Sequence, residues 1–370
     1  MLDDVKISLR QFTVLAVLIT IGDSILVLPA VPALVAKQDA WISGLVGLAA
    51  GLVIVYLLCK AWALQPRLTF IESSRIILGK WLGGAVSLLF LGYLFLSAAA
   101  HIREIGDFMT TEILTKTPYA AIHILFLYII VLGSWLGLEA IARTGEIFIP
   151  LLVSLFLIPL VAILPLAHGE RILPILEEGM KPIIRGSITF TAFPFMELVV
   201  FLMVLPYVEQ TDKVTKRFLC GAMLGGVVLI VVMVLAIMVL GPELTARHLY
   251  PTYALAKKIS IGHFFQRVEA ILAFFWILTT YFKIAVYFLA FIIGLAQLLT
   301  LKEYRALILP MGMILLALAS IISPNISYYN EVIASYWPLF DMTYSVLFPL
   351  CLVAVAFLRK IRKPLSRPIQ

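Results

Sequence analysis

The sequence predicts an all-α integral membrane protein of about ten transmembrane helices, arranged as two halves of five. Three observations support this prediction. Hydrophobic residues make up 62% of the 370 residues and charged residues only 13%, too little polar surface to cover a water-soluble globule. The apolar residues form ten runs, most of them close to the roughly 20 residues that a bilayer crossing takes. The first and sixth of these runs contain residues that interrupt helices.

The predicted spans follow one another closely along the chain. They cover residues 11 to 35, 41 to 62, 82 to 113, 119 to 138, 146 to 166, 187 to 207, 218 to 241, 264 to 299, 306 to 323 and 337 to 358. The third and eighth exceed the bilayer thickness, so we expect them to tilt or to extend into the aqueous layer. Because five is an odd number, the second half has the opposite orientation. A single membrane domain, 1–370, then consists of an inverted repeat, 11–166 and 187–358, and a basic cytoplasmic tail, 359–370.

Positive charge predicts which side of the membrane is cytoplasmic. Most lysines and arginines lie on the same side as the N-terminus, which places both termini in the cytoplasm. The net charge of +7 therefore reflects loop orientation. We expect no nucleic-acid binding, because the basic residues form short blocks between apolar runs and not one basic face. The chain also lacks a cationic segment before a short cleavable hydrophobic region, so we expect the first helix to be retained.

The sequence shows no pattern typical of an enzyme or a metalloprotein. The cysteines Cys59, Cys220 and Cys351 are isolated, and buried thiols are the default interpretation. The five histidines are scattered singly, without an HExxH motif, and neither GxSxG nor a pair of catalytic acids is present. We therefore predict no catalytic residues, no metal, no cofactor and no enzymatic activity.

The two interruptions are the strongest functional signal. Gly22 and Asp23 interrupt the first run, and Pro194 with Glu197 interrupts the sixth. A proline within a helix in hydrocarbon leaves a backbone carbonyl unpaired, so polar groups become available there. Interrupted helices at equivalent positions of two halves point to a substrate site at the bilayer midplane of an inverted-repeat transporter fold. Open amides near Gly22 would suit the carboxylate of an amino acid.

Helix rise places further polar residues at the depth of these interruptions. Counting about 1.5 Å per residue from the membrane faces, the midplane falls near Tyr93 and Ser97 in the third span and near Thr279 and Lys283 in the eighth. Each pair has i,i+4 spacing and shares a helical face. Placing an ionisable group at this depth costs free energy, so such a group is by default interpreted as functional. The predicted ligand-binding residues are Gly22, Asp23, Tyr93, Ser97, Phe195, Met196, Glu197, Thr279 and Lys283.

Several of these residues have a structural alternative. Lys283 could pair with Glu197 or Asp23 and lock two helices together, or it could recognise ligand charge or act in proton-coupled switching. Glu197 could stabilise the interrupted helix, and Phe195 could be a packing residue. A second cluster lies a turn or more beyond the midplane, where we expect an outer vestibule or an ion-pair network. Its members are His101, Arg103, Glu104, Asp107 and Glu112.

Two small-residue motifs occupy matching positions in the halves. Gly47-x-x-x-Gly51 lies in the second span and Gly221-x-x-x-Gly225 in the seventh. Small residues at this spacing let helix backbones approach closely. Chance is the alternative in a chain with 22 glycines, but the matching placement favours the repeat. In the long loop after the seventh span, residues 252–259 are expected to form a short helix that caps the outer face.

Five short motifs resemble one protein family. They are Ile7-Ser8-Leu9-Arg10-Gln11-Phe12, Gly22-Asp23, Leu28-Pro29, Pro194-Phe195-Met196-Glu197 and the run from Trp276 to Lys283. With the chain length and span layout, they resemble the B subunit of the spore germinant receptors, the GerAB/GerKB-type spore germination proteins of the amino acid/polyamine/organocation (APC) transporter superfamily. The resemblance implies a LeuT-type fold, the spore inner membrane, and partner A and C subunits.

The resemblance also implies a function. The B subunit senses nutrient germinants, commonly amino acids, and triggers germination. By position, the pocket would be lined by Gly22, Tyr93, Ser97, Met196 and its neighbours, Thr279 and Lys283. Met196 stands where a small residue is expected, so the pocket can differ in size. The alternative function is a proton-coupled amino acid permease, in which Lys283 or Glu197 takes up and releases a proton in the same pocket.

Overall fold

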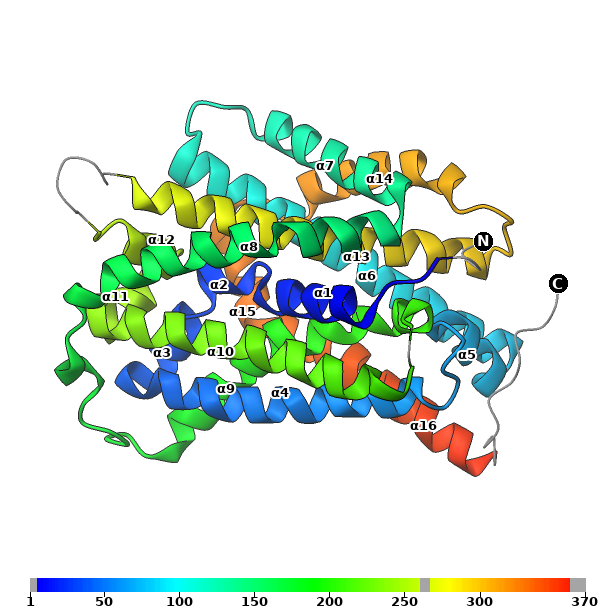
Figure 1. Ribbon diagram of the computed structural model, residues 1–370, viewed down its shortest axis with the longest axis horizontal. Helices are drawn as coiled ribbons and strands as arrows, with labels where there is room; N and C mark the ends of the chain where they lie inside the picture. Colours follow the sequence, from blue (N-terminus) through cyan, green and yellow to red (C-terminus); the bar gives the residue numbers. More distant parts are fainter. Residues whose placement is uncertain (1–4, 210, 260–266, 360–370) are drawn as a thin grey trace.

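The computed structural model of the chain describes residues 5–209, 211–259 and 267–359. These residues form a bundle of long helices that run roughly along one axis, and α1 (Leu9–Ile21) begins at the same end of the bundle at which α16 (Phe348–Leu358) finishes (Figure 1). In the described part, nine helical segments are long and apolar enough to cross a membrane, and a tenth, Arg305–Ile321, is shorter. The chain is a multi-pass membrane protein.

The first half of the chain begins with three short helices in place of one long one. In chain order it contains α1, α2 (Ser24–Val27), α3 (Ala30–Ala36), η1 (Lys37–Asp39), α4 (Ala40–Trp62), α5 (Phe70–Leu78), α6 (Lys80–Phe108), η2 (Met109–Ile113), α7 (Tyr119–Leu136), α8 (Leu138–Ile163), η3 (Leu164–Leu166) and η4 (Gly169–Ile172). The segment η2 is a π-helix that extends α6, and the other η segments are 3₁₀-helices.

The second half begins with the interrupted sixth span. It contains α9 (Met180–Phe195), η5 (Met196–Met203), η6 (Leu205–Tyr207), η7 (Thr211–Lys213), α10 (Val214–Leu240), α11 (Pro242–Arg247), α12 (Pro251–Ala256), α13 (Val268–Leu298), η8 (Arg305–Leu307), α14 (Ile308–Ile321), α15 (Ile326–Met342), η9 (Thr343–Leu347) and α16. The π-helix η9 joins α15 and α16 into one span. The predicted capping helix corresponds to α12, whereas residues 260–266 and most of the basic tail lie outside the described residues.

Three helices start at least seven residues earlier than the sequence predicts. The fifth predicted span, 146 to 166, begins at Leu138, the sixth, 187 to 207, at Met180, and the tenth, 337 to 358, at Ile326. The additional turns carry charged residues such as Glu139 and Arg185. A count of apolar residues omits these turns, although their backbone groups are hydrogen-bonded within the helix. The hydropathy pattern therefore predicts the apolar part of each helix, and the full helix is longer.

The two glycine motifs form close helix contacts in a reciprocal pattern. Helix α4 packs on α9, and α10 packs on α1. The residues facing the glycines are Phe190 at Gly47, Phe195 at Gly51, Ala16 at Gly221 and Thr20 at Gly225. The second helix of each half thus contacts the interrupted helix of the other half, as an inverted repeat predicts. This packing supports the division into 11–166 and 187–358, which stays a prediction.

We expect Gly51→Ala to lower the stability of the folded protein. A Cβ atom at Gly51 would lie 2.2 Å from Cγ of Phe195, so α4 and α9 would have to separate. Overpacking of this kind costs about 1–3 kcal/mol. The measurement is the thermal unfolding midpoint of the purified chain in detergent. Gly84→Ala is the matched control, because nothing lies within 4 Å of its Cβ position, and equal midpoints for the two variants would contradict the prediction.

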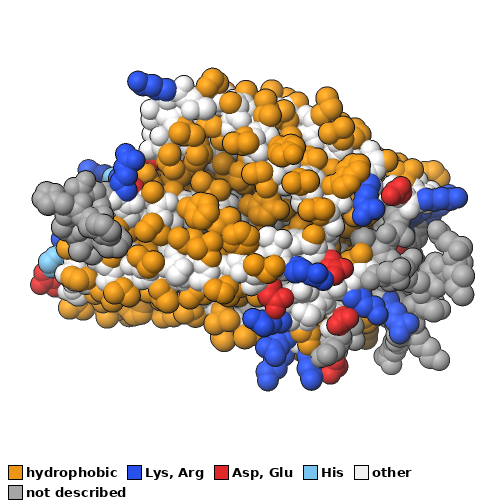
Figure 2. Space-filling model, turned by 45° about the horizontal axis from the view of Figure 1, so that its top comes forward, with side chains coloured by type: hydrophobic (Ala, Val, Ile, Leu, Met, Phe, Trp, Pro, Cys, Tyr) orange, Lys and Arg blue, Asp and Glu red, His pale blue; other side chains and the backbone are white. Residues whose placement is uncertain are grey.

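The surface of the protein is divided into an apolar belt and polar ends. Figure 2 shows hydrophobic side chains over the middle of the visible face and charged side chains gathered toward the two ends. Helix α8 contributes strongly to the belt, since the apolar window of its span is only 17% buried inside the protein. A continuous exposed apolar surface of this extent fits contact with lipid. The bundle axis therefore lies across the bilayer.

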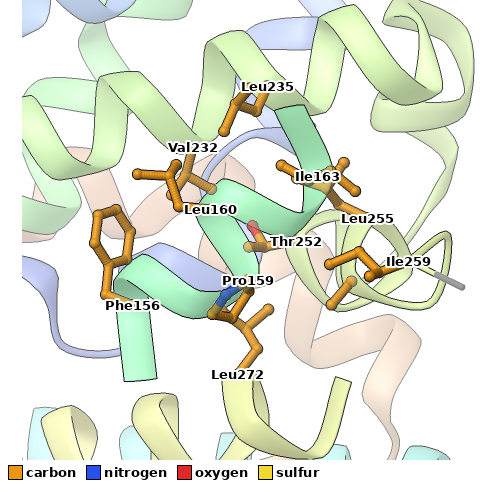
Figure 3. Close-up of a pocket in the computed structure, with 11 residues that line it drawn as sticks. Phe156, Pro159, Leu160, Ile163, Val232, Leu235, Thr252, Leu255, Ile259 and Leu272 are labelled. Carbon is orange, nitrogen blue, oxygen red and sulfur yellow. The ribbon is translucent and has the colours of Figure 1, made fainter. Parts of the chain in front are cut away.

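A small second core joins four helices near the end of the bundle opposite the termini. Leu160 and Ile163 of α8 meet Val232 and Leu235 of α10, and Leu255 of α12 closes the group (Figure 3). Together with Leu272 of α13, these side chains surround an apolar cavity of about 30 Å³. This core holds α12 in place beside the interrupted first helix.

Candidate functional site

The first interruption separates α1 from α2 and α3. Gly22 ends α1 with a φ of +31°, a backbone conformation that favours glycine. Pro29 lies four residues after Ile25 and has no N–H to pair with the Ile25 carbonyl. The hydroxyl of Thr252 in α12 donates to that carbonyl at 2.6 Å instead. The carbonyl that the proline leaves without an N–H partner is thus paired by α12, which follows the seventh span.

The second interruption changes the winding of the sixth helix without opening a gap. Helix α9 continues through Pro194 to Phe195, and the 3₁₀-helix η5 begins at Met196. A 3₁₀-helix pairs each carbonyl with the residue three positions on and has three residues per turn. Backbone pairing is thus maintained while the side chains after Phe195, including Glu197, turn to other directions. The first helix is therefore interrupted at Gly22, and the predicted discontinuity of the sixth helix takes the form of a change from α to 3₁₀ winding at Met196.

One face of α13 connects the two interruptions. Its residues at positions 276, 279, 283 and 287 recur every three or four residues and point to the same side. The hydrogen bonds run from Trp276 Nε1 to the Asp23 carbonyl (3.0 Å), from Thr279 Oγ1 to the Gly22 carbonyl (3.1 Å) and from Tyr287 Oη to the Glu197 carbonyl (2.6 Å). Helix α13 therefore provides hydrogen-bond donors to both interrupted helices.

Lys283 links the interruptions by charge. Its ammonium group contacts the carboxylates of both Asp23 and Glu197. Lys283 is fully buried, and Glu197 and Asp23 are 1% and 6% exposed. Because an unpaired buried charge costs several kcal/mol, mutual pairing is what permits three ionisable groups here. Lys283 thus occupies the helix-locking position that the sequence offered as one alternative. Whether it also recognises a ligand stays a prediction.

His101 belongs to the same group, although the sequence placed it in the outer cluster. Its Nε2 lies 3.5 Å from Glu197 Oε2, and its Nδ1 lies 3.8 Å from Asp23 Oδ2 and 3.9 Å from Glu104 Oε2. Counting inward from the membrane faces misplaced it because α6 is longer than the bilayer and its depth depends on tilt. Its i,i+4 spacing from Ser97 was the signal that could have identified it.

The donor atoms of Asp23, His101 and Glu197 lie within 4.8 Å of one another, an arrangement able to hold a metal ion. The Lys283 ammonium already contacts both carboxylates. The protein therefore supplies a cation of its own to these two carboxylates.

A cavity of about 200 Å³ lies beside this group, toward the end of the bundle opposite the termini. Its wall includes three carboxylates, Asp23, Glu104 and Glu197, with His101 beside them, and many apolar side chains, with Val31, Leu249, Ile333 and Trp337 among others. Of the predicted ligand residues, Asp23 and Glu197 line it. Those outside its lining are Gly22, Tyr93, Ser97, Phe195, Met196, Thr279 and Lys283.

Three of these seven residues, Tyr93, Ser97 and Phe195, are buried in other parts of the protein. Phe195 packs against Gly51 and Gly226, which fits the packing alternative. The Tyr93 hydroxyl donates to Asp341 Oδ1 at 3.0 Å, and Asp341 is a fully buried carboxylate that the sequence reasoning missed. The Ser97 hydroxyl is buried without a hydrogen-bond partner among the described residues. Their predicted ligand roles stay predictions.

Two interrupted helices around a buried charged centre define a fold class, the LeuT-type fold. Comparison with solved structures agrees with this class. Mhp1, a nucleobase-cation-symport-1 family transporter in a closed conformation with bromovinylhydantoin bound, has a TM-score of 0.71 at 13% identity over 98% of this chain and 81% of its own. MhsT in complex with L-phenylalanine has a TM-score of 0.69 at 12% identity, over 95% and 99%. The predicted LeuT-type fold is confirmed.

Residues 6–327 match the spore germination protein family, and the chain belongs to this family. Spore germination protein KB of Bacillus subtilis (strain 168) is 28% identical over 370 residues, which cover 99% of this chain and 98% of the relative. The family resemblance seen in the sequence motifs is therefore confirmed over nearly the whole chain.

Proposed function

We propose that the chain is the membrane subunit of a spore germinant receptor that senses a small nutrient, an amino acid, and triggers germination. Membership of the spore germination protein family supports the role in germination. The observation that carries the proposal is the cavity of about 200 Å³, because its wall includes one carboxylate from each interrupted helix, Asp23 and Glu197. A small molecule there contacts both helices at once.

The ion pairs of Lys283 suggest how binding changes the conformation. A ligand that interacts with Asp23 or Glu197 competes with Lys283 for the same carboxylates. Binding then favours the arrangement in which α1 and η5 are less tightly held against α13. A ligand shifts such an equilibrium only by its difference in affinity for the two states.

A backbone link carries this shift to the end of the bundle at which the chain begins. The amide of Ile7 donates to the Tyr207 carbonyl at 2.9 Å, and the amide of Glu209 donates to the Ile7 carbonyl at 3.0 Å. The start of the first span and the end of the sixth span therefore move together. We place this end in the cytoplasm, the protein in the spore inner membrane, and receptor A and C subunits as the partners that receive the signal.

Gly22→Val tests the function. A Cβ atom at Gly22 would lie 2.7 Å from Lys283 Cδ and 2.9 Å from the Ile19 carbonyl, so the variant displaces the lysine from its carboxylates. In spores that carry the receptor, we expect the amino acid concentration giving half-maximal germination to rise at least about tenfold, equivalent to about 1.4 kcal/mol. Germination is followed by the loss of optical density after adding single L-amino acids.

The control for this test is Gly92→Val, since nothing lies within 4 Å of that Cβ position. Both variants must be present in the membrane at the level of the native chain, which immunoblotting of spore membranes measures. A native dose response from correctly inserted Gly22→Val would contradict the proposal.

The second candidate is a proton-coupled amino acid permease. The fold of Mhp1 and MhsT is consistent with it, and the placement of Lys283 between two carboxylates gives protonation a direct effect on the ion pairs. Uptake of labelled amino acids into proteoliposomes that contain this chain alone distinguishes the candidates. Uptake driven by a pH gradient supports the permease, whereas binding without uptake supports the receptor.

A further inference from the structure

Of the three carboxylates in the cavity wall, Asp23 and Glu197 pair with Lys283, and Glu104 does not. It extends from α6 into the lining, is 7% exposed, and its Oε1 has no hydrogen-bond partner among the described residues. Its Oε2 lies 3.9 Å from Nδ1 of His101. Burying a carboxylate oxygen without a hydrogen-bond donor costs free energy. A ligand in the cavity could provide the donor that Glu104 Oε1 lacks.

The charges around the cavity leave a negative excess at its inner end. Asp23, Glu104 and Glu197 face two basic side chains, Lys283 and His101. When Glu104 is ionised, three carboxylates share two positive charges even with His101 protonated. An uncompensated charge at membrane depth strongly favours a cationic group beside it.

The outer part of the cavity has the opposite charge. Arg247, at the end of α11, lines the cavity, is exposed, and forms no ion pair with a described residue. The cavity wall also includes the apolar side chains of Val31, Ile333 and Trp337. The cavity thus combines an anionic end, an apolar wall and a cationic mouth.

We propose that Glu104 binds the ammonium group of the ligand, with the carboxylate toward Arg247 and an apolar side chain against Trp337 and Ile333. This assignment rests on the proposed function and narrows its ligand to uncharged, apolar α-amino acids. It reverses the polarity expected from the sequence, in which the ligand carboxylate met open amides near Gly22. The Gly22 amide already donates to the Leu18 carbonyl at 2.8 Å.

The test uses the purified full-length chain in nanodiscs and three matched sets of ligands. The amino acids are L-alanine, L-leucine and L-phenylalanine. The amines that lack the carboxylate are ethylamine, 3-methylbutylamine and 2-phenylethylamine. The acids that lack the amine are propionate, 4-methylpentanoate and 3-phenylpropionate. Calorimetry measures each dissociation constant for the native chain, Glu104→Gln, Arg247→Gln and Glu112→Gln.

We expect an amino acid and its matching amine to bind and the matching acid not to bind. Glu104→Gln should weaken both at least tenfold, while Arg247→Gln should weaken the amino acid and leave the amine unchanged. Glu112→Gln is the control, because Glu112 pairs with the exposed Lys257 at 2.6 Å outside the cavity lining. Acids that bind as tightly as the amines, native affinity in Glu104→Gln, or no binding by any of the nine compounds would overturn the proposal.

Failure of the site and failure of the function give different results. Suppose that an amino acid triggers germination through the native chain and that the purified Glu104→Gln variant binds this amino acid with native affinity. The Glu104 assignment is then wrong, and the receptor function stands. If binding depends on Glu104 but germination does not depend on this chain, the site stands and the receptor function is wrong.

Discussion

Lys283→Met is expected to destabilise the folded protein by about 3–5 kcal/mol, the usual cost of removing one partner from a buried ion pair. Without the lysine, Asp23 and Glu197 would be left buried beside each other with no ammonium between them. The variant also removes the contact that joins the two interrupted helices through α13. The measurement is the thermal unfolding midpoint in detergent, together with the yield of monodisperse protein.

A triple variant separates charge from packing in this prediction. Asp23→Asn, Glu197→Gln and Lys283→Met together remove all three charges and retain approximate side-chain volume. Because neutral replacements for a complete buried ion pair are often tolerated, we expect most of the stability to return. The germination response should not return, since the Lys283 ion pairs that ligand binding is proposed to weaken are absent. If Lys283→Met alone unfolds at the native midpoint, the ion pairs do not stabilise the fold.

The interruptions could be predicted from the sequence because their causes are local. A glycine followed by an aspartate inside an apolar run, and a proline inside another, disturb helix pairing whatever surrounds them. The glycine spacing at Gly47 and Gly51 is equally local. For this reason the positions of both interruptions and the small-residue helix contacts were correct, as was the fold class.

The bonds that organise the centre depend on tertiary packing and could not be derived in this way. Trp276 and Tyr287 look like ordinary apolar-helix residues until α13 is aligned with the two interruptions. The bond from Thr252 to Ile25 depends on how a loop helix folds back. Asp341 could have been identified from the sequence, because it is an ionisable residue inside the predicted span 337 to 358.

The location of the cavity also depends on tertiary packing. It extends from the interruptions toward α11 and α15, so its lining includes Tyr329 and Trp337 of the tenth span. The sequence reasoning considered depth in the first, third, sixth and eighth spans alone. The estimated depths therefore placed Asp23, Glu197, Thr279 and Lys283 close to one another, as the structure does. They did not predict on which side of this group the cavity lies.

Arg103→Leu is the second substitution for which we expect a loss of about 3–5 kcal/mol. The Arg103 side chain is buried, donates from Nε to Asp107 Oδ2 at 2.9 Å, and donates from Nη1 to the Ser323 carbonyl at 2.6 Å. Its guanidinium also lies over the ring of Tyr119, 4.9 Å from the centroid. The variant leaves the Asp107 carboxylate and the Ser323 carbonyl without these donors. Thermal unfolding of the purified chain measures the loss.

The chain contains a matched control for this arginine. Arg143 and Glu139 form an ion pair with the same separation of four residues at 2.6 Å, but their side chains are 64% and 47% exposed. Arg143→Leu should therefore change stability by no more than about 0.5 kcal/mol. Equal effects of the two substitutions would mean that burial does not set the strength of the Arg103 interactions.

The position of Ser323 connects this stability effect to the cavity. Ser323 lies just before α15, whose residues Tyr329 and Asn330 form part of the cavity wall. Arg103 therefore fixes where α15 begins relative to α6, which carries another residue of the cavity wall, Glu104. If Arg103→Leu is studied below its unfolding temperature, amino acid affinity should fall even though Arg103 itself is not part of the lining. Native affinity in the folded variant would show that α15 keeps its place without this bond.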